Sequence, residues 1–255
     1  MAEWDWEGYA DDAEAALAAD LSRVMRSIAS RYRDQEYVSL SQEDRDRIEA
    51  ALGNVWGGAM RGQVDAMTEE FRDCGLRLET KDDRTFWQIV RDAFVEQWGA
   101  AKVAQIAETT RLQMLRIVRE GVTEGLSVDG IGRLMRDAIP DLSALRAHII
   151  ARTETHSAAQ YAALRTAQTA TRPLDKIWNS VEDARTRDFG EGDGEVDTHN
   201  HRVMDGVRVG PNDPFLVPTK YGAKEPLMYP GDPAGVAGNV INCRCAMTFK
   251  RSGRE

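Results

Sequence analysis

Apolar residues in the first two thirds of the chain recur every three or four positions, and this pattern predicts amphipathic helices. One helix is expected to start after Ser41, which can act as an N-cap with Asp44 three residues later. Residues 86–98 place their large apolar side chains on one face, and a further helix is expected from residue 103 to about residue 124. The sequence therefore begins with a predominantly helical part.

Two more helices are predicted before the pattern changes. Residues 125–140 form a short one, with Ser127 as its N-cap and Pro140 as its stop, because proline lacks the amide that a helix interior needs. A long helix then runs from residue 141 to about residue 170. The short connections between these segments favour antiparallel packing of the helices.

The composition and the pattern of apolar residues change near residue 171. Seven of the eight prolines lie at or beyond Pro173, and short apolar runs bounded by Gly, Pro, Asn or Asp replace the helical pattern. Such runs predict short strands; they read KIWNSV, GVRV, PFLVP, NVI and AMTF. The expected fold class is α+β: an antiparallel helical domain over residues 1–170, followed by a small loop-rich, β-containing module over residues 171–255.

Charge is distributed unevenly between these two parts. The net charge is −9, but residues 151–255 carry 14 basic and 14 acidic side chains, so all the excess acid lies in residues 1–150. An acidic part repels phosphate backbones, so only the neutral module and its basic tail are expected to contact double-stranded DNA. No apolar run is long enough for a membrane span. The acidic N-terminus does not resemble a secretion signal, which predicts a protein that stays in the cytoplasm.

Residues 199–201 spell His-Asn-His, which suggests a nuclease at first sight. The HNH nucleases bring these residue types together from distant positions, whereas neighbouring side chains on an extended chain point to opposite faces. The tripeptide therefore does not predict a nuclease. His199 and His201 can share a face only if this segment is extended.

Cys243 and Cys245 form a Cys-x-Cys pair whose side chains project the same way on a strand. A disulfide between them would require a strained ring, and the odd number of cysteines argues against a disulfide framework. Together with His199 and His201 they offer the ligands that zinc prefers. The alternative is two reduced thiols in a small core, with the histidines on a surface turn.

The remaining polar patterns do not predict catalysis. Arg152 and Glu154 either belong to a polar helix face at a domain contact or orient the loops of the C-terminal module. A run of acidic residues mixed with glycine predicts a solvated loop, and it lacks the spacing of an EF-hand; it comprises Asp183, Asp188, Glu191, Asp193, Glu195 and Asp197. We find neither a nucleotide-binding glycine motif nor a nucleophile with its base, so no enzyme is predicted.

The order of motifs in the second half resembles the phage Mu F-like minor head proteins, also called head-morphogenesis proteins. The resemblance covers about residues 100–249, through IARTET, IWNSVEDARTRDF, MDGVRV, PFLVP, LMYPGDPAG and NVINCRC. The positions that match the family's motifs are Arg152, Glu154, Trp178, Asp183, Arg187, His201, Asp205, Gly206, Asp232, Asn242, Cys243, Arg244 and Cys245.

This resemblance implies a minor capsid protein of a tailed phage or prophage, packaged inside the procapsid near the portal. It would be made in the host cytoplasm, end in the virion, and act in head assembly and in DNA packaging or ejection. Portal, scaffold and capsid proteins would be its partners. Many relatives carry further Cys and His residues that suggest zinc, and this chain lacks those residues. A metal-dependent nuclease or toxin-like effector that uses the His and Cys residues remains the alternative.

Overall fold

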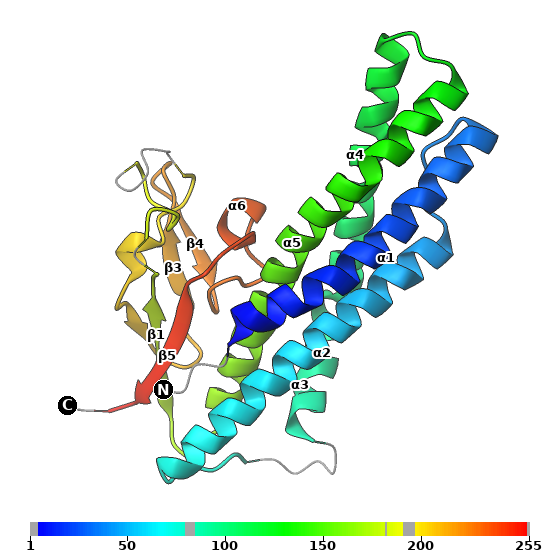
Figure 1. Cartoon of the computed structure of the whole chain (residues 1–255). Helices are drawn as coiled ribbons and strands as arrows, with labels where there is room; N and C mark the ends of the chain where they lie inside the picture. The colour runs from blue at the N-terminus through cyan, green and yellow to red at the C-terminus, as the bar shows by residue number, and fades with distance from the viewer. Residues whose placement is uncertain (1–4, 80–84, 182, 191–196, 254–255) are drawn as a thin grey trace. The chain divides into compact units, whose positions relative to one another are not determined.

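The computed structural model describes residues 5–79, 85–181, 183–190 and 197–253, and it confirms the α+β fold class. Helices come first and short strands follow (Figure 1). The elements are α1 (Trp6–Gln35), α2 (Gln42–Asp73), α3 (Phe86–Phe94), a π-helix (Val95–Gly99), α4 (Ala100–Thr123), α5 (Val128–Gln168), β1 (Leu174–Asn179), a 3-10 helix (Arg202–Met204), β2 (Arg208–Val209), β3 (Phe215–Pro218), β4 (Lys224–Leu227), α6 (Ala237–Val240) and β5 (Ala246–Arg251).

The chain forms two compact units. The helical unit contains Gly8–Val55 and Val95–Ala151, and the mixed unit contains the residues up to Glu7, Trp56–Phe94 and the chain from Arg152 onward. Helices α1, α2 and α5 contribute residues to both units. The proposed division into a helical domain over residues 1–170 and a module over residues 171–255 stays a prediction.

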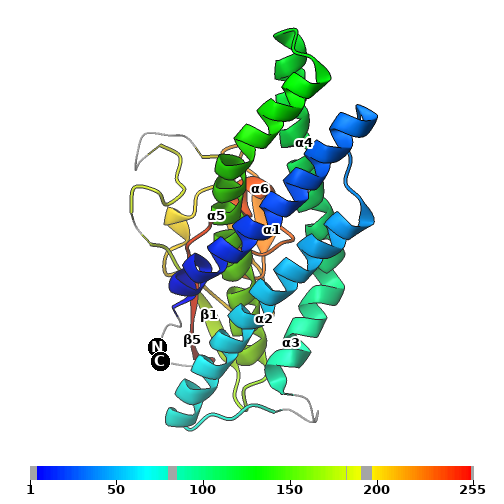
Figure 2. The same ribbon diagram turned by 45° about the vertical axis from the view of Figure 1, so that its right-hand side comes forward.

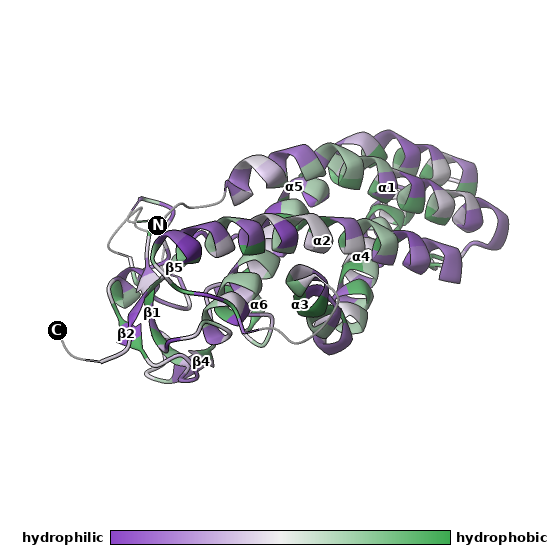
Figure 3. Cartoon of the chain, turned by 90° about the horizontal axis from the view of Figure 1, so that it is seen from below, coloured by the Kyte–Doolittle hydropathy of each residue, from purple (hydrophilic) through white to green (hydrophobic). Residues whose placement is uncertain are grey.

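Four helical segments, from α1, α2, α4 and α5, form the core of the helical unit. Leu21, Leu52, Ile106 and Ile150 come one from each helix and line a common apolar interior. Burying such a side chain contributes about 1.5–3 kcal/mol. Hydrophilic and hydrophobic residues lie on different sides of the helices (Figure 3). None of the described helices combines the length and the apolar character needed to cross a membrane.

The predicted helix starts at Ser41 and Ser127 are confirmed. The Asp44 amide donates to Ser41 Oγ over 3.2 Å, and the Ser41 amide donates to Asp44 Oδ2 over 2.8 Å, which makes a reciprocal capping box. The Arg31 guanidinium also binds the Asp44 carboxylate. Ser127 Oγ accepts a hydrogen bond from the Gly130 amide over 3.2 Å, at the start of α5.

The prediction that Pro140 stops a helix is wrong. Pro140 lies inside α5, which continues from Val128 to Gln168. A proline costs an interior helix about 3 kcal/mol, but Met135 and Ile139 before it and Ala147 after it are fully buried or nearly so. Burial of apolar residues on both sides of the proline therefore outweighs the lost hydrogen bond.

The sheet of the mixed unit has the strand order β2-β1-β5, with both pairs antiparallel. Figure 1 shows β1 beside β5. Trp178 of β1 pairs with Met247 of β5, and alternate residues of β1 point inward, as the burial pattern shows. Strands β3 and β4 form a separate hairpin. The view in Figure 2 shows α3 beside α2, where Trp56 and Phe94 make an edge-on ring contact at 5.5 Å.

One strand prediction in this unit is wrong and one strand was missed. The run NVI lies in and just after α6, a single helical turn, because Asn239 is a buried polar residue with side-chain partners on other elements. Strand β4, with the sequence KEPL, carries too little apolar character to predict a strand, and it is held by its pairing with β3.

Two glycines of the helical unit offer a matched test of its packing. A Cβ at Gly121 would lie 2.7 Å from Ile131 Cγ1, whereas a Cβ at Gly53 would meet nothing within 4 Å. Gly121→Ala should therefore lower the free energy of unfolding by about 1–3 kcal/mol, and Gly53→Ala should raise it by about 0.5–1 kcal/mol. Urea unfolding followed by far-UV circular dichroism measures both values. Equal stability of the two variants would contradict the packing described here.

Candidate metal centre

Three side chains on one face of α5 hold the backbone of residues 242–247. They are spaced three and four residues apart, which places them on the same side of a helix. The bonds join the Asn242 amide to Thr153 Oγ1 (3.1 Å), His156 Nε2 to the Cys245 carbonyl (2.7 Å) and the Met247 amide to Gln160 Oε1 (3.0 Å). The chain from Asn242 to Met247, which leads from α6 into β5, is thus fixed to α5 at three positions.

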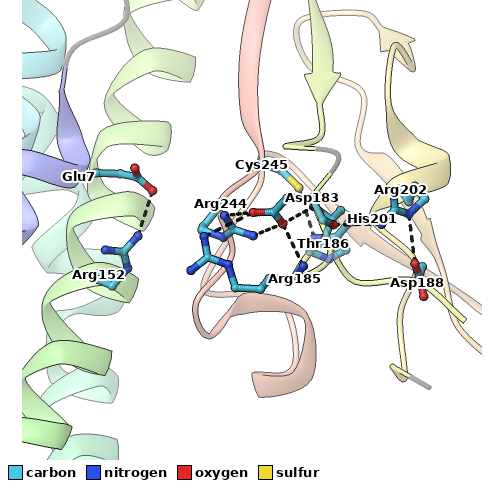
Figure 4. Close-up of polar contacts among 10 residues, drawn as sticks. All are labelled: Glu7, Arg152, Asp183, Arg185, Thr186, Asp188, His201, Arg202, Arg244 and Cys245. Carbon is cyan, nitrogen blue, oxygen red and sulfur yellow. Dashed lines mark hydrogen bonds and ion pairs between the residues drawn. The ribbon is translucent and has the colours of Figure 1, made fainter. Parts of the chain in front are cut away.

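Arg152 and Glu154, singled out in the sequence, have other partners. Arg152 Nη2 donates to Glu7 Oε1 over 2.9 Å (Figure 4), and the buried Glu154 carboxylate accepts from Trp56 Nε1 over 3.1 Å. These bonds join α5 to Glu7 and Trp56, and the interpretation that the two residues orient the loops of the module stays a prediction. Their neighbours on α5 hold the 242–247 segment; Thr153 lies within the motif IARTET, whereas nothing in the sequence marked Gln160.

His156 is fully buried, and burial lowers its pKa to about 4, although its bond to the Cys245 carbonyl acts in the opposite direction. The imidazole is therefore neutral near pH 7, and its Nε2–H donates to that carbonyl. Its ring lies edge-on to Trp6, with the centroids 4.8 Å apart. Its other nitrogen, Nδ1, is buried without a hydrogen-bond partner among the described residues.

His201, Cys243 and Cys245 meet in one buried cluster. His201 Nδ1 lies 3.7 Å from Cys243 Sγ and 3.5 Å from Cys245 Sγ, and all three ligand atoms lie within 4.8 Å of one another. His201 directly precedes the 3-10 helix, while the cysteines lie between α6 and β5. Asn242, with φ of 55°, makes the turn that leads from α6 toward the cysteines. The fold therefore joins three of the four residues that the sequence suggested as ligands.

His199 does not belong to this cluster. Its Nε2 lies 3.1 Å from Glu225 Oε2 and its Nδ1 lies 2.9 Å from Thr198 Oγ1, so both ring nitrogens are already engaged. The expected shared face required an extended backbone, but His201 has φ of −88° and ψ of −25°. This helical conformation breaks the alternation of strand side chains and separates the two histidines.

A chain of buried polar contacts connects His199 to His201. Glu225 Oε2, which faces His199, also accepts from Asn239 Nδ2 over 2.7 Å, and Asn239 Oδ1 contacts His201 Nε2. Because an amide oxygen can only accept, His201 Nε2 carries the proton and Nδ1 presents its lone pair to the sulfurs. Asn239 and Glu225 are thus part of the site, although the sequence gave no reason to select them.

The two thiols have different acidities. Burial raises the pKa of Cys243, while a hydrogen bond from Cys243 lowers the pKa of Cys245 against the effect of burial, and His201 acts in the same direction. One thiolate is therefore favoured, with the other thiol as its donor. The Trp178 ring lies edge-on to His201 at 5.3 Å and closes one side of the cluster.

Ion pairs fix the loop beside the cluster (Figure 4). Arg244 binds both oxygens of Asp183, with one contact at 2.7 Å, and this bond holds the pKa of Asp183 well below its usual value. The Arg187 guanidinium donates to the Ile241 carbonyl. Arg202 Nε binds Asp188 Oδ2 over 3.1 Å.

The acidic run is only partly what the sequence predicted. Asp188 is 2 % exposed and binds an arginine, so this part of the run is not a solvated loop. Asp197 Oδ2 accepts from the Asp188 amide over 3.1 Å, which ties the last acidic residue of the run to Asp188. Glu191, Asp193 and Glu195 lie outside the described residues.

The other residues of the recognised motifs hold turns of the backbone. Asp205 Oδ1 accepts from the Ser180 amide over 2.8 Å, and the Gly206 amide donates to the Trp178 carbonyl from a left-handed conformation with φ of 72°. The buried Asp232 accepts from two amides of its own turn, those of Met228 (2.8 Å) and Ala234 (3.0 Å). These carboxylates act as acceptors that fix loops rather than as a converging pair.

Comparison of the chain with known protein families finds a match to one family model. A family model described as phage Mu protein F like protein matches residues 113–248, which is just over half of the chain. The match includes all of α5, the whole cluster of His201, Cys243 and Cys245, and the first part of β5. Neither the curated proteins nor the solved structures contain a significant match.

Gly231, which lies beside His156, allows a test of the contacts through which α5 holds residues 242–247. A Cβ at Gly231 would lie 2.6 Å from His156 Nδ1, whereas a Cβ at Gly222 would meet nothing within 4 Å; the φ angles, 78° and 80°, are alike. The left-handed backbone should lower the free energy of unfolding of both alanine variants by about 1–2 kcal/mol. The clash with His156 should lower that of Gly231→Ala by about 1–3 kcal/mol more. Thermal unfolding measures the difference.

The double variant Gly231→Ala/His156→Ala controls for this interpretation. Because the second substitution removes the ring that the new methyl group meets, the two costs should be less than additive. Additive costs, or equal costs of the two glycine variants, would show that Gly231 and His156 are not packed as described.

Proposed function

The chain belongs to the phage Mu protein F-like family, a family of phage head morphogenesis proteins, and from this premise we propose that it is a minor capsid protein packaged inside the procapsid of a tailed phage or prophage, near the portal. There it acts in head assembly and in DNA packaging or ejection. The observation that carries the proposal is the family match over residues 113–248, a stretch that contains all of α5 and nearly all of the strand-containing part of the mixed unit.

The contacts of the motif residues support a structural role. Asp183 pairs with Arg244, and Asp205 and Asp232 accept from backbone amides, so each of these carboxylates stabilises a loop. A hydrolase needs a general base within reach of a substrate. His201 instead directs one nitrogen to Asn239 and the other to the two sulfurs.

The distribution of charge supports the choice of partners. The excess acid lies in residues 1–150, which suits contacts with portal, scaffold or capsid proteins rather than with phosphates. Residues 151–255 carry no net charge, and their last strand, β5, ends with the basic residues Lys250 and Arg251. Any contact with double-stranded DNA is therefore proposed through this part, as a non-specific and salt-sensitive interaction.

Particle composition tests the proposal. Phage or prophage particles produced with and without the gene for this chain should differ, because a packaged minor protein is present in both procapsids and virions of the wild type. Mass spectrometry should find the chain in both, in fewer copies than the major capsid protein, and cross-linking in procapsids should join it to the portal. Loss of the gene should reduce infectious titre. A chain absent from procapsids and virions contradicts the proposal.

The nuclease alternative is tested by direct assay. The purified chain, incubated with plasmid DNA or with RNA and with magnesium, manganese or zinc, should leave both substrates intact, because the ring nitrogens of His201 face Asn239 and the cysteine sulfurs. Gel electrophoresis measures this result. Metal-dependent cleavage that disappears in His201→Ala but persists in Cys74→Ser would instead establish the alternative.

A further inference from the structure

We propose that His201, Cys243 and Cys245 bind one zinc-type divalent metal ion through three protein ligands, and that a water molecule supplies the exchangeable fourth ligand. This inference goes beyond the proposed role in head morphogenesis and does not depend on it.

The spacing of the three ligand atoms fits one tetrahedral ion. Zinc binds imidazole nitrogen at about 2.0–2.1 Å and thiolate sulfur at about 2.3 Å, so a nitrogen and a sulfur on adjacent tetrahedral corners lie about 3.6 Å apart. The observed distances from His201 Nδ1 are 3.7 Å to Cys243 Sγ and 3.5 Å to Cys245 Sγ. Both distances from Nδ1 thus match those of a tetrahedral zinc site, and the two sulfurs lie within 4.8 Å of each other.

The orientation of the His201 ring is already the one that a metal ligand needs. Asn239 Oδ1 accepts from Nε2, so the lone pair of Nδ1 faces the sulfurs, and Glu225 in turn holds the Asn239 amide. Partners of this kind fix the tautomer of metal-binding histidines in known sites. Asn239 and Glu225 are therefore positioning residues for the metal site.

The three ligands also match the charge of a divalent metal ion. Such an ion engages the nitrogen and both sulfurs, and two thiolates neutralise its charge inside a buried site. The chemistry of two sulfurs and one imidazole selects zinc over oxygen-preferring ions such as magnesium or calcium.

The water ligand is assigned to a small pocket that two of the three metal ligands, His201 and Cys245, line. Within the described residues, the group of converging His, Cys, Asp and Glu contains these three members alone, and His199 is held by Glu225. The pocket is lined by Val181, Arg185, Thr186, Arg187, His201, Asn242, Arg244 and Cys245. Its free space, about 10 Å³ for the centre of a water molecule, matches what one bound water needs.

Metal analysis of the purified full-length chain tests the proposal. After purification with a reductant and zinc, wild type should contain about one zinc ion per chain. Replacement by cobalt should give sulfur-to-metal charge-transfer absorption and the intense visible bands of tetrahedral coordination. Cys243→Ser, Cys245→Ser and His201→Gln should lose the metal, and Asn239→Ala should bind it about 10–100-fold more weakly.

Two matched controls separate this site from other arrangements. Cys74→Ser removes the exposed cysteine and should keep the full metal content. His199→Gln should still bind the ion, at most as weakly as Asn239→Ala, because His199 holds Glu225 and is not itself a ligand. Complete loss of the metal in His199→Gln with an intact circular dichroism spectrum would overturn the three-ligand arrangement, as would metal loss in Cys74→Ser.

A measurement on wild type avoids dependence on folded variants. A chelator should remove the metal, lower the melting temperature and expose the two buried thiols to a thiol reagent, while Cys74 reacts at the same rate with or without the chelator. Protein that holds no metal after exposure to zinc, or whose thiol reactivity and melting temperature do not change on chelation, overturns the proposal. Neither result bears on the incorporation of the chain into particles.

Discussion

The segment from Asn242 to Met247 is bound from two sides, and the arrangement of the candidate site depends on this. On one side, Thr153, His156 and Gln160 of α5 bind its backbone directly. On the other side, the strand that follows pairs antiparallel with β1. Because a buried backbone group without a partner costs about as much as a lost hydrogen bond, a shift of this segment would break several bonds at once. The cysteine side chains are thereby fixed in position.

Buried polar groups elsewhere in the mixed unit follow the same principle. His199, Glu225, Asn239 and His201 satisfy one another in sequence, from elements that lie far apart along the chain. A buried network of this kind is stable only when its members find partners, and it then specifies a single arrangement. This network explains why a polar residue such as Asn239 is fully buried in a short helical turn.

The family match and the structure give a consistent account of the motif residues. Most of them hold loops or turns: Asp183 with Arg244 beside the cluster, Asp205 and Gly206 between β1 and β2, and Asp232 after β4. A module held by many specific side-chain to backbone bonds needs these residue types whether or not it carries out chemistry. This fits a family whose members act in building a phage head, and it leaves the His and Cys cluster as the place where a metal would add to the stability of the unit.

The sequence by itself determined the fold class, the helical faces, the starts of two helices and the strands β1, β2, β3 and β5, because these depend on local periodicity and capping. It also selected His201, Cys243 and Cys245, since histidines and a Cys-x-Cys pair can be recognised as possible metal ligands from residue type and spacing alone. Tertiary structure decided the rest. Packing on both sides carries α5 through Pro140, a helical backbone at His201 turns His199 away from the cysteines, and Asn239, Glu225, Thr153 and Gln160 join the site through contacts across the fold. Such contacts depend on distance in space, which the order of residues does not encode locally.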